Sequence, residues 1–543
     1  MVEIAPPRGA ALPGVSRRAL AGVAGASLAA SALFWSPLLL GGALAGRDWA
    51  SHHWHYFDWL RTSLLEYGTL PLYMADAWIT ANFWANAESP VLGPLVPLLF
   101  ALPTGAYLKL AIVLFTAAGL AGAFLLLRDL GASAPVAAPL AAVFAAGGFF
   151  VSHVSAGHPW ALGGELLPGL LLLYRRAALD SGPALWGGAA LGAAAILGGQ
   201  HQPFVWQNGV LAGFGLLWAL RVRSPFPLAR LGLLWLATAG IAAVKLLPMA
   251  LEFADYAPQA RIPGLPVGLL AASLVGRGQG PELAPAGLAY AHGAGWWEYA
   301  FYVGAAPLVL LAAGLALARR VWPLAALGAC LALLAVDWSR AGLDPWAALG
   351  SWPIGRTQRA PSRLLFPALA LLLVAAAPGV ERLYRAARRR WPRGALAASL
   401  ALGFGIGADL FLESLPWQRA ALGEPIASVD HRPRPLGIRS AGGARAELAA
   451  FAPNRLVYRV RAPGPQELLL PLRYGPWGLE WRLEPELPAR DRRGRLAVRL
   501  EAGERELALR YRPAGLAPGA ALSAAALAAL AIGAWRRRRG APA

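Results

Sequence analysis

Residues 107–127 read YLKLAIVLFTAAGLAGAFLLL, and Lys109 is the one charged side chain in this stretch. A helix needs about 20 mostly apolar residues to cross the hydrocarbon core of a bilayer. A helix also satisfies its own backbone polar groups, which lipid cannot do. The stretch therefore predicts a membrane-spanning helix, and similar apolar runs recur along the chain.

The overall composition agrees with a membrane protein. Of the 543 residues, 57% are hydrophobic and 14% are charged, and the mean hydropathy is +0.48. Soluble domains carry about 25% charged residues. A soluble protein of this composition would expose mostly apolar surface, so we expect lipid to surround much of the chain.

The net charge of +20 comes from short arginine clusters between the apolar runs. Such clusters mark the cytoplasmic ends of membrane helices, so we interpret the charge as topology and expect no nucleic-acid partner. Cys330 is the single cysteine. An intrachain disulfide and a cysteine-based metal site are therefore excluded.

Placing the arginine clusters in the cytoplasm predicts about twelve membrane helices, with both termini on the cytoplasmic side of a bacterial inner membrane. The approximate spans are 19–46, 107–127, 134–151, 161–174, 184–199, 204–220, 231–250, 300–318, 322–336, 364–380, 394–412 and 515–535. The first span could instead be a cleaved signal peptide, because Arg17 and Arg18 precede it and Ala43-Leu-Ala45 ends it. Its length favours an uncleaved helix.

Three parts of the chain are expected. Residues 1–412 form a polytopic membrane domain whose first outer loop, 47–106, is large and rich in Trp, His and acidic residues. Residues 413–514 form an outer domain, and from Ala444 onward polar and apolar side chains alternate, as in the stretch RLVYRVR at 455–461, which is typical of strands. Residues 515–543 form the last helix and a basic cytoplasmic tail. The predicted fold class is mainly α, with a small extracytoplasmic β-sandwich-like domain before the last helix.

Asp48 is the strongest candidate for a catalytic residue, because it follows the first predicted span directly at the outer face. Ionisable groups at such positions are costly and often functional. A carboxylate there is suited to act as a general base that takes a proton from an acceptor hydroxyl. The alternative is an interfacial aspartate that pairs with Arg47 or Arg61.

Other polar side chains gather in the predicted outer segments. Seven of the eight histidines lie there, and His431 heads the outer domain. The candidate substrate-binding residues are His52, His158, Gln200, His201, Glu298, Arg356, Arg359 and Arg363. The stretch that contains Gln200 and His201 either lines a cavity or forms a hydrated hairpin tip.

The three arginines Arg356, Arg359 and Arg363 precede a predicted span at its outer end, against the positive-inside trend. Guanidinium groups match phosphate oxygens bidentately and stay charged at any working pH. A polyprenyl phosphate or a phospholipid head group is therefore the expected partner. The alternative is unspecific contact with membrane lipid through long side chains that reach the interface.

A metal site is a further possibility for this loop, because His52, His53, His55 and Asp58 resemble a ligand cluster. Their spacing matches no known metal motif, and interfacial aromatic residues lie between them. We therefore predict no metal ligands, and a divalent cation remains open as a cofactor.

Several short stretches, in this order, resemble YfhO-like bacterial membrane proteins. They are 68–73 (GTLPLY), 81–90 (ANFWANAESP), 157–158 (GH), 199–202 (GQHQ), 298–304 (EYAFYVG), 359–363 (RAPSR) and 496–522. The resemblance implies a GT-C-like glycosyltransferase fold, an acidic catalytic position in the first periplasmic loop and a polyprenyl-phosphate sugar as donor. Asp48 matches that acidic position, and Arg359 and Arg363 match the basic pattern before the late helix.

The chain departs from the family pattern at three places. Tyr73 stands where Trp is usual, 86–88 read NAE in place of Asn-Pro-Gln, and 474–477 read YGPW in place of Tyr-Pro-Gly-Trp. These departures bear on the identity of the acceptor more than on the predicted fold.

The resulting hypothesis is an inverting sugar transfer to a cell-envelope glycan or lipid acceptor on the outer face. Asp48 activates the acceptor, and Arg359 and Arg363 hold the departing lipid phosphate. His158, His201 and Glu298 position the sugar or the acceptor, and the small β domain binds acceptor glycan or caps the cleft. No phosphate-binding glycine loop for a nucleotide is found in the sequence, in agreement with a lipid donor.

Two other functions stay open. One is a transporter or flippase of lipid-linked glycans, against which few charged residues fall within the predicted spans, Lys245 being the main one. The other is a non-catalytic assembly factor for envelope polymers, in which Asp48 would tolerate substitution.

Overall fold

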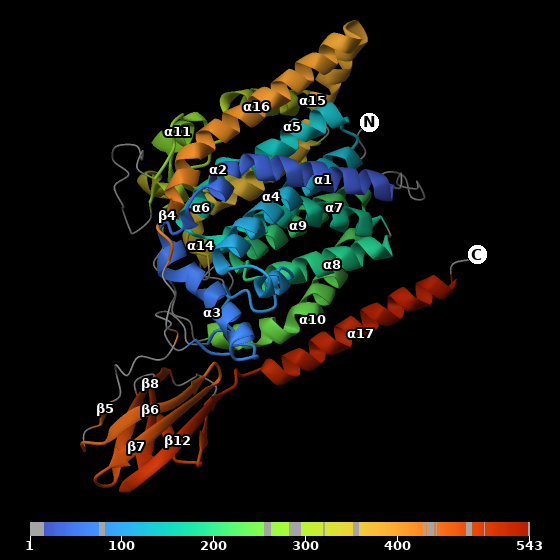
Figure 1. Ribbon diagram of the computed structural model, residues 1–543. Helices are drawn as coiled ribbons and strands as arrows, with labels where there is room; N and C mark the ends of the chain where they lie inside the picture. Colours follow the sequence, from blue (N-terminus) through green and yellow to red (C-terminus); the bar gives the residue numbers. More distant parts are fainter. Residues whose placement is uncertain are drawn as a thin grey trace.

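Figure 1 shows a computed structural model in which a large helical body is joined to a separate β region near the C-terminal end of the chain. The structure describes residues 16–74, 82–179, 181–254, 262–281, 295–318, 321–350, 358–426, 431, 439–440, 442–473, 481–492 and 495–540. The chain is mainly helical, and its β-rich region lies between the last two long helices, as predicted.

Among the described residues, six helical segments are long and apolar enough to cross a membrane. They are α4 (Thr104–Asp129), the pair α5 (Ala134–Ala145) and α6 (Gly148–Ala156), α10 (Phe226–Ala254), α15 (Leu365–Arg390), α16 (Pro392–Ala420) and α17 (Leu516–Gly540). Three shorter apolar helices are α8 (Gly182–Leu197), α12 (Ala305–Leu317) and α13 (Trp322–Leu334). Nine of the twelve predicted spans therefore fall on these nine segments, and six segments have the length of a full span.

The other three predicted spans, 19–46, 161–174 and 204–220, do not coincide with a helix of that kind among the described residues. Residues 19–46 fall on α1 (Arg17–Phe34) and α2 (Ser36–Leu40), which are separated at Trp35. Pro37 lies in the first turn of α2, where the missing N–H of proline is tolerated. Residues 161–174 begin in a 3-10 helix, η3 (Pro159–Leu166), before α7 (Leu167–Ala178), and 204–220 lie in α9 (His201–Val222).

The degree of burial separates a central helix from peripheral ones. In α15, 94% of its most apolar stretch is buried, against 17% in α16 and 11% in α17. Exposed apolar helix surface of this extent is unfavourable in water. The surfaces of α16 and α17 are therefore suited to contact lipid, with α15 packed inside the body.

Charged groups gather at one end of the helical body. Asp129, at the end of α4, forms ion pairs with Arg175 and Arg176 at the end of α7. Ser133 in the following turn donates from its backbone N–H to Glu381, near the end of α15. Figure 1 shows that α1 begins and α17 ends at the same end of the body, while the β region lies at the opposite end.

The β region consists of two four-stranded sheets with the strand orders β6-β7-β12-β9 and β10-β11-β8-β5. The strands are β5 (Arg439–Ser440), β6 (Arg445–Ala452), β7 (Arg455–Ala462), β8 (Gln466–Arg473), β9 (Trp481–Glu484), β10 (Ala489–Asp491), β11 (Arg495–Leu500) and β12 (Gly503–Tyr511). Alternate side chains from both sheets, such as Leu456, Leu470 and Val498, share one buried core. The helix α16 continues to Ala420, so the sheets begin later than the predicted domain boundary at residue 413.

The first loop of the membrane domain enters the β region. Tyr73 is buried in the core of the sheets, with its ring centroid 4.7 Å from that of Trp481 and 5.2 Å from that of Tyr511. Asn454 accepts a hydrogen bond from the Leu72 N–H at 2.6 Å and donates one to the Leu70 carbonyl at 2.9 Å. The β region is thereby attached to the loop that carries Asp48.

Candidate functional site

Asp48 precedes a short π-helix, η1 (Trp49–His53), which continues directly into α3 (Trp54–Leu65). Arg47 has a φ of 45°, in the left-handed region that few residues other than glycine adopt. Its guanidinium lies 3.9 Å from the ring centre of Trp297. Such backbone strain is concentrated at functional sites because the surrounding structure must hold it in place.

A turn after α6 approaches the backbone of Asp48 closely. Gly157 ends α6 with a φ of 86°, and a Cβ at this position would lie 2.7 Å from the Asp48 carbonyl carbon. Trp49 donates from Nε1 to the Val154 carbonyl at 2.7 Å. Only glycine permits both this conformation and this approach, so the sequence Gly157-His158 brings His158 beside Asp48.

Asp48 and His158 form the central pair of the site. Their Oδ2 and Nε2 atoms lie 3.1 Å apart, and the Asp48 side chain is 49% exposed while that of His158 is 10% exposed. Partial burial disfavours the ionised form of Asp48. The hydrogen bond from His158 and the charges of His158, His53 and His52 nevertheless lower its pKa below the ordinary aspartate value. Asp48 is therefore an ionised, accessible carboxylate at neutral pH.

A second group beside this pair joins His52, His53 and Glu88. Glu88 Oε2 lies 3.5 Å from His52 Nε2 and 3.9 Å from His53 Nε2. Burial lowers the pKa of His53 to about 3, although the Glu88 carboxylate opposes this effect. Burial also acts to raise the pKa of Glu88, but the hydrogen bond from His52 and the charge of His53 hold it well below the usual range. At neutral pH the group therefore contains a neutral imidazole beside an ionised carboxylate.

A third group lies on the other side of His158 and is centred on Arg363. Arg363 donates from Nε to Glu298 Oε2 at 2.9 Å, and its two terminal nitrogens donate to Glu298 and to Gln202. His153 Nε2 lies 3.6 Å from Glu298 Oε2. Burial acts to raise the pKa of Glu298, but the charge of Arg363 and the hydrogen bond with His153 keep it well below the usual range.

Trp160 connects the first and third groups. Its ring stacks on His158 at 5.2 Å between centroids, and the Arg363 guanidinium lies 4.3 Å from its ring centre. Because Arg363 is buried and already paired with Glu298, it differs from the interfacial arginine that the sequence suggests. The carboxylate of Glu298 neutralises the guanidinium of Arg363, which the sequence assigns to a lipid phosphate.

The remaining predicted residues lie around these groups. Gln200 is buried and His201 is half-buried at the tip between α8 and α9. Gln200 Oε1 and His201 Nδ1 have no hydrogen-bond partner within the described part of the chain. Arg359 is half-buried, and its backbone carbonyl accepts a hydrogen bond from the Ile262 N–H at 2.9 Å. Arg356 lies outside the described residues.

Two sets of side chains have the geometry of a metal site. The ligand atoms of His52, His53 and Glu88 lie within 4.8 Å of one another, as do those of a second set, His153, His158 and Glu298. Two imidazoles and one carboxylate are a known ligand set for zinc. Arg363 is bound to the carboxylate of the second set, and its charge repels a cation. The first set is therefore the better candidate for a divalent ion.

The sequence analysis did not single out Glu88, Gln202 or Trp160 as site residues. Glu88 reaches the histidines because Gly199, with a φ of 84°, lets the α8–α9 tip approach the Glu88 backbone; a Cβ there would meet the Glu88 carbonyl oxygen. The sequence does place a carboxylate and several histidines in the predicted outer segments, which suggests that they cluster. Which histidines Glu88 contacts, however, depends on tertiary packing. No protein-family model matches the chain, and no curated protein matches it.

Proposed function

We propose that this protein is a membrane glycosyltransferase of the GT-C type. It transfers a sugar from a polyprenyl-phosphate donor to a cell-envelope glycan or lipid acceptor, on the outer face of a bacterial cytoplasmic membrane. The observation that carries the proposal is the pair of Asp48 and His158, 3.1 Å apart, with Asp48 half-exposed in front of buried polar groups. An ionised carboxylate held by a histidine at the edge of a membrane domain is suited to accept a proton from a hydroxyl group.

The orientation of this site relative to the charged end supports the topology. The helix α3, which follows Asp48 in the chain, lies on the side of the β region, whereas the arginine-rich end of α15 lies at the other end of the body. Arginine-rich ends face the cytoplasm. The Asp48 site then faces outward, the β region is extracytoplasmic and both termini are cytoplasmic, with twelve crossings as the complete topology.

The reaction is a single displacement. The acceptor oxygen attacks the anomeric carbon, and its proton passes to Asp48 as the new C–O bond forms. The bond between the anomeric carbon and the phosphate oxygen breaks with its electron pair on that oxygen, so polyprenyl phosphate leaves as the anion. His158 holds Asp48 through Nε2, and this hydrogen bond orients the carboxylate oxygen that accepts the proton.

Cations must balance the charge of the departing phosphate. Arg363 is committed to Glu298, so we assign it to positioning His153 and Trp160 rather than to direct phosphate contact. Arg359 and Arg356 keep their proposed role at the lipid phosphate. Arg47, exposed beside Asp48 and stacked on Trp297, is a further candidate for that contact.

The test uses cells that lack the protein, complemented with the wild type or with Asp48→Asn. We expect one glycan modification to disappear and its lipid-linked sugar to accumulate in the deletion strain. Wild type should restore both, and Asp48→Asn should restore neither, because general-base catalysis contributes about 10²–10⁴-fold to rates. Mass spectrometry of envelope glycans and of extracted lipids gives both readouts.

Glu506→Gln is the matched control, since it neutralises a carboxylate that is 64% exposed in β12. It should restore the glycan as wild type does. Full restoration by Asp48→Asn would remove Asp48 from catalysis and favour a non-catalytic assembly role. Accumulation of an unchanged lipid-linked glycan on the cytoplasmic leaflet would favour a flippase.

A further inference from the structure

A cavity of about 630 Å³ lies between α3 and the β region, apart from the Asp48 site. One wall is formed by α3 and the turn after it, a second by the start of α4, and a third by Ile426, His431 and Phe451. Pockets for small organic ligands range from about 300 to 1,000 Å³. The cavity therefore has room for a short saccharide.

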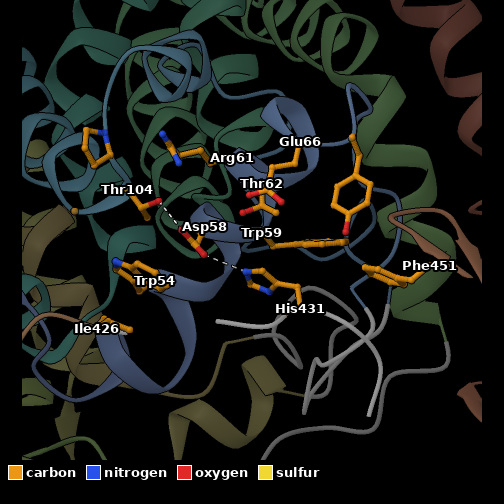
Figure 2. Close-up of a pocket in the computed structure, with 13 residues that line it drawn as sticks. Trp54, Asp58, Trp59, Arg61, Thr62, Glu66, Thr104, Ile426, His431 and Phe451 are labelled. Atoms are coloured by element: carbon orange, nitrogen blue, oxygen red, sulfur yellow. Dashed lines mark hydrogen bonds and ion pairs between the residues drawn. The ribbon is translucent and has the colours of Figure 1, made fainter. Parts of the chain in front are cut away.

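One side of α3 supplies the polar lining. Trp54, Asp58, Arg61 and Thr62 follow one another at helical spacing, so their side chains point to the same side. Figure 2 shows Asp58 between Thr104 and His431. Thr104 Oγ1 donates to Asp58 Oδ1 at 2.9 Å, and His431 Nε2 lies 3.1 Å from Asp58 Oδ2.

These two contacts fix the orientation of the Asp58 carboxylate and leave it able to accept further hydrogen bonds. Its side chain is 16% exposed, so it faces the cavity from a mostly buried position. Each carboxylate oxygen can accept two hydrogen bonds, and one contact to each oxygen from the described residues leaves capacity for ligand hydroxyl groups. A fixed carboxylate that can accept from two neighbouring hydroxyls is the arrangement that a sugar ring requires.

Aromatic rings flank this carboxylate. Trp54 lies on one side of it in Figure 2, and Trp59 and Phe451 lie on the other. The rings of Trp59 and Phe451 are stacked at 5.9 Å between centroids, and Tyr67 meets Phe451 edge to face at 6.0 Å. Trp59 itself is buried, whereas Trp54 and Phe451 are half-buried and Tyr67 is exposed. The C–H face of a pyranose ring packs favourably on such accessible rings, while its hydroxyl groups reach the polar wall.

The charges of the described lining residues disfavour an anionic ligand. Among the described residues that line the cavity, Asp58 and Glu66 are acidic and Arg61 is the one arginine. Arg61 already donates from Nε to the Leu102 carbonyl at 3.2 Å. A phosphate or a uronic acid would therefore meet more negative than positive charge. A neutral sugar avoids this repulsion.

We infer that this cavity binds a neutral sugar unit of the acceptor glycan. Asp48 and Asp58 are ten residues apart on the continuous η1 and α3, a separation of about 15 Å at 1.5 Å per residue. A glycan of a few sugar units held at Asp58 can extend to Asp48. The word "acceptor" rests on the proposed function, whereas sugar binding does not.

The experiment is saturation-transfer NMR on the full-length protein in nanodiscs. The probes are the methyl glycosides of glucose, galactose and N-acetylglucosamine, their disaccharides, and methyl glucuronide. We expect at least one neutral probe to bind and the glucuronide to bind more weakly. Asp58→Asn and Trp54→Ala should each weaken binding by about tenfold or more, as expected for the loss of hydrogen bonds to a charged group or of a stacking ring.

Two control variants keep these features. Glu506→Gln changes an exposed carboxylate, and Trp322→Ala changes a tryptophan that is 68% exposed on α13. Both should bind the probes as wild type does, and thermal unfolding should show that all variants are folded. Absence of binding by every probe, stronger binding of the glucuronide, or unchanged binding by both cavity variants would overturn the inference.

Asp48→Asn separates this inference from the proposed function. It should bind the neutral probe as wild type does while losing transfer. Binding without any transfer in cells leaves the cavity standing and removes the transferase. If sugar transfer depends on Asp48 but no probe binds in the cavity, the proposed transferase stands and the sugar-binding cavity is ruled out.

Discussion

At the scale of single residues, the site depends on pairings between distant parts of the chain. The sequence identifies Asp48 and His158 as separate candidates, and the structure places their side chains 3.1 Å apart. Residue types alone could suggest that outer histidines and carboxylates meet, because such groups are costly near lipid unless they are paired. Residue types could not suggest that Glu298 forms an ion pair with Arg363, since that contact depends on how the segment before α15 packs.

His53 gives a prediction on pH. Its pKa is lowered from 6.5 to about 3 in the folded protein, so below pH 6.5 the unfolded chain binds a proton that the folded chain does not. The contribution of the neutral His53 side chain to the free energy of unfolding is therefore complete above pH 6.5 and decreases as the pH is lowered toward 3. Between pH 7 and pH 5 this loss should amount to about 2 kcal/mol.

His53→Gln should therefore flatten the decline of the free energy of unfolding between pH 7 and pH 5. Chemical unfolding of the detergent-solubilised protein at several pH values measures this slope. Ser51→Ala, which changes an exposed side chain in η1 and adds or removes no titratable group, should keep the wild-type slope. An equal slope in wild type and His53→Gln would contradict the assignment.

At the scale of elements, most helices follow from apolar runs in the sequence. Nine of the twelve predicted spans fall on long or shorter apolar helices. The 19–46 run instead forms two helices that are separated at Trp35, and the apolar pattern alone does not show this interruption. The 3-10 start of 161–174 is likewise set by packing around Trp160 and Glu165, which are both buried.

Gly157 tests whether the turn after α6 positions Asp48. Gly157→Ala places a Cβ against the Asp48 backbone and also strains a φ of 86°. Gly131→Ala strains a φ of 89° but meets no atom within 4 Å. The left-handed conformation alone costs an alanine about 1–2 kcal/mol.

We expect both variants to lose that amount of stability, and Gly157→Ala to lose more and to restore little glycan in the deletion strain. Thermal unfolding and glycan profiling measure the two effects. The idea fails if Gly131→Ala and Gly157→Ala reduce stability and glycan restoration to the same extent.

At the scale of the whole molecule, the division into a helical body and a late β region is predictable because periods of two and runs of about 20 apolar residues are distinct signals. The attachment of the two parts is not predictable from these signals. Tyr73 is one of many aromatic residues in the long first loop, and its burial among Trp481 and Tyr511 depends on contacts across more than 400 positions of sequence. The cavity around Asp58 arises from the same attachment.

The proposed topology predicts opposite accessibility of the two ends. In a background that carries Cys330→Ala, Glu506→Cys in β12 and Arg388→Cys near the end of α15 provide one thiol each. A membrane-impermeant maleimide added to cells with a permeable outer envelope should label Glu506→Cys and spare Arg388→Cys until the inner membrane is opened. Labelling of both, or the reverse pattern, would contradict the topology.

The central claim is that Asp48 drives sugar transfer from a lipid donor, and a reaction with purified components tests it most directly. Wild-type protein and Asp48→Asn are reconstituted in liposomes with the sugar lipid that accumulates in the deletion strain and with an envelope extract as acceptor. We predict that wild type converts the lipid to polyprenyl phosphate, and that Asp48→Asn is slower by about hundredfold or more. Equal conversion by both proteins, or a lipid that changes leaflet without changing mass, would contradict the claim.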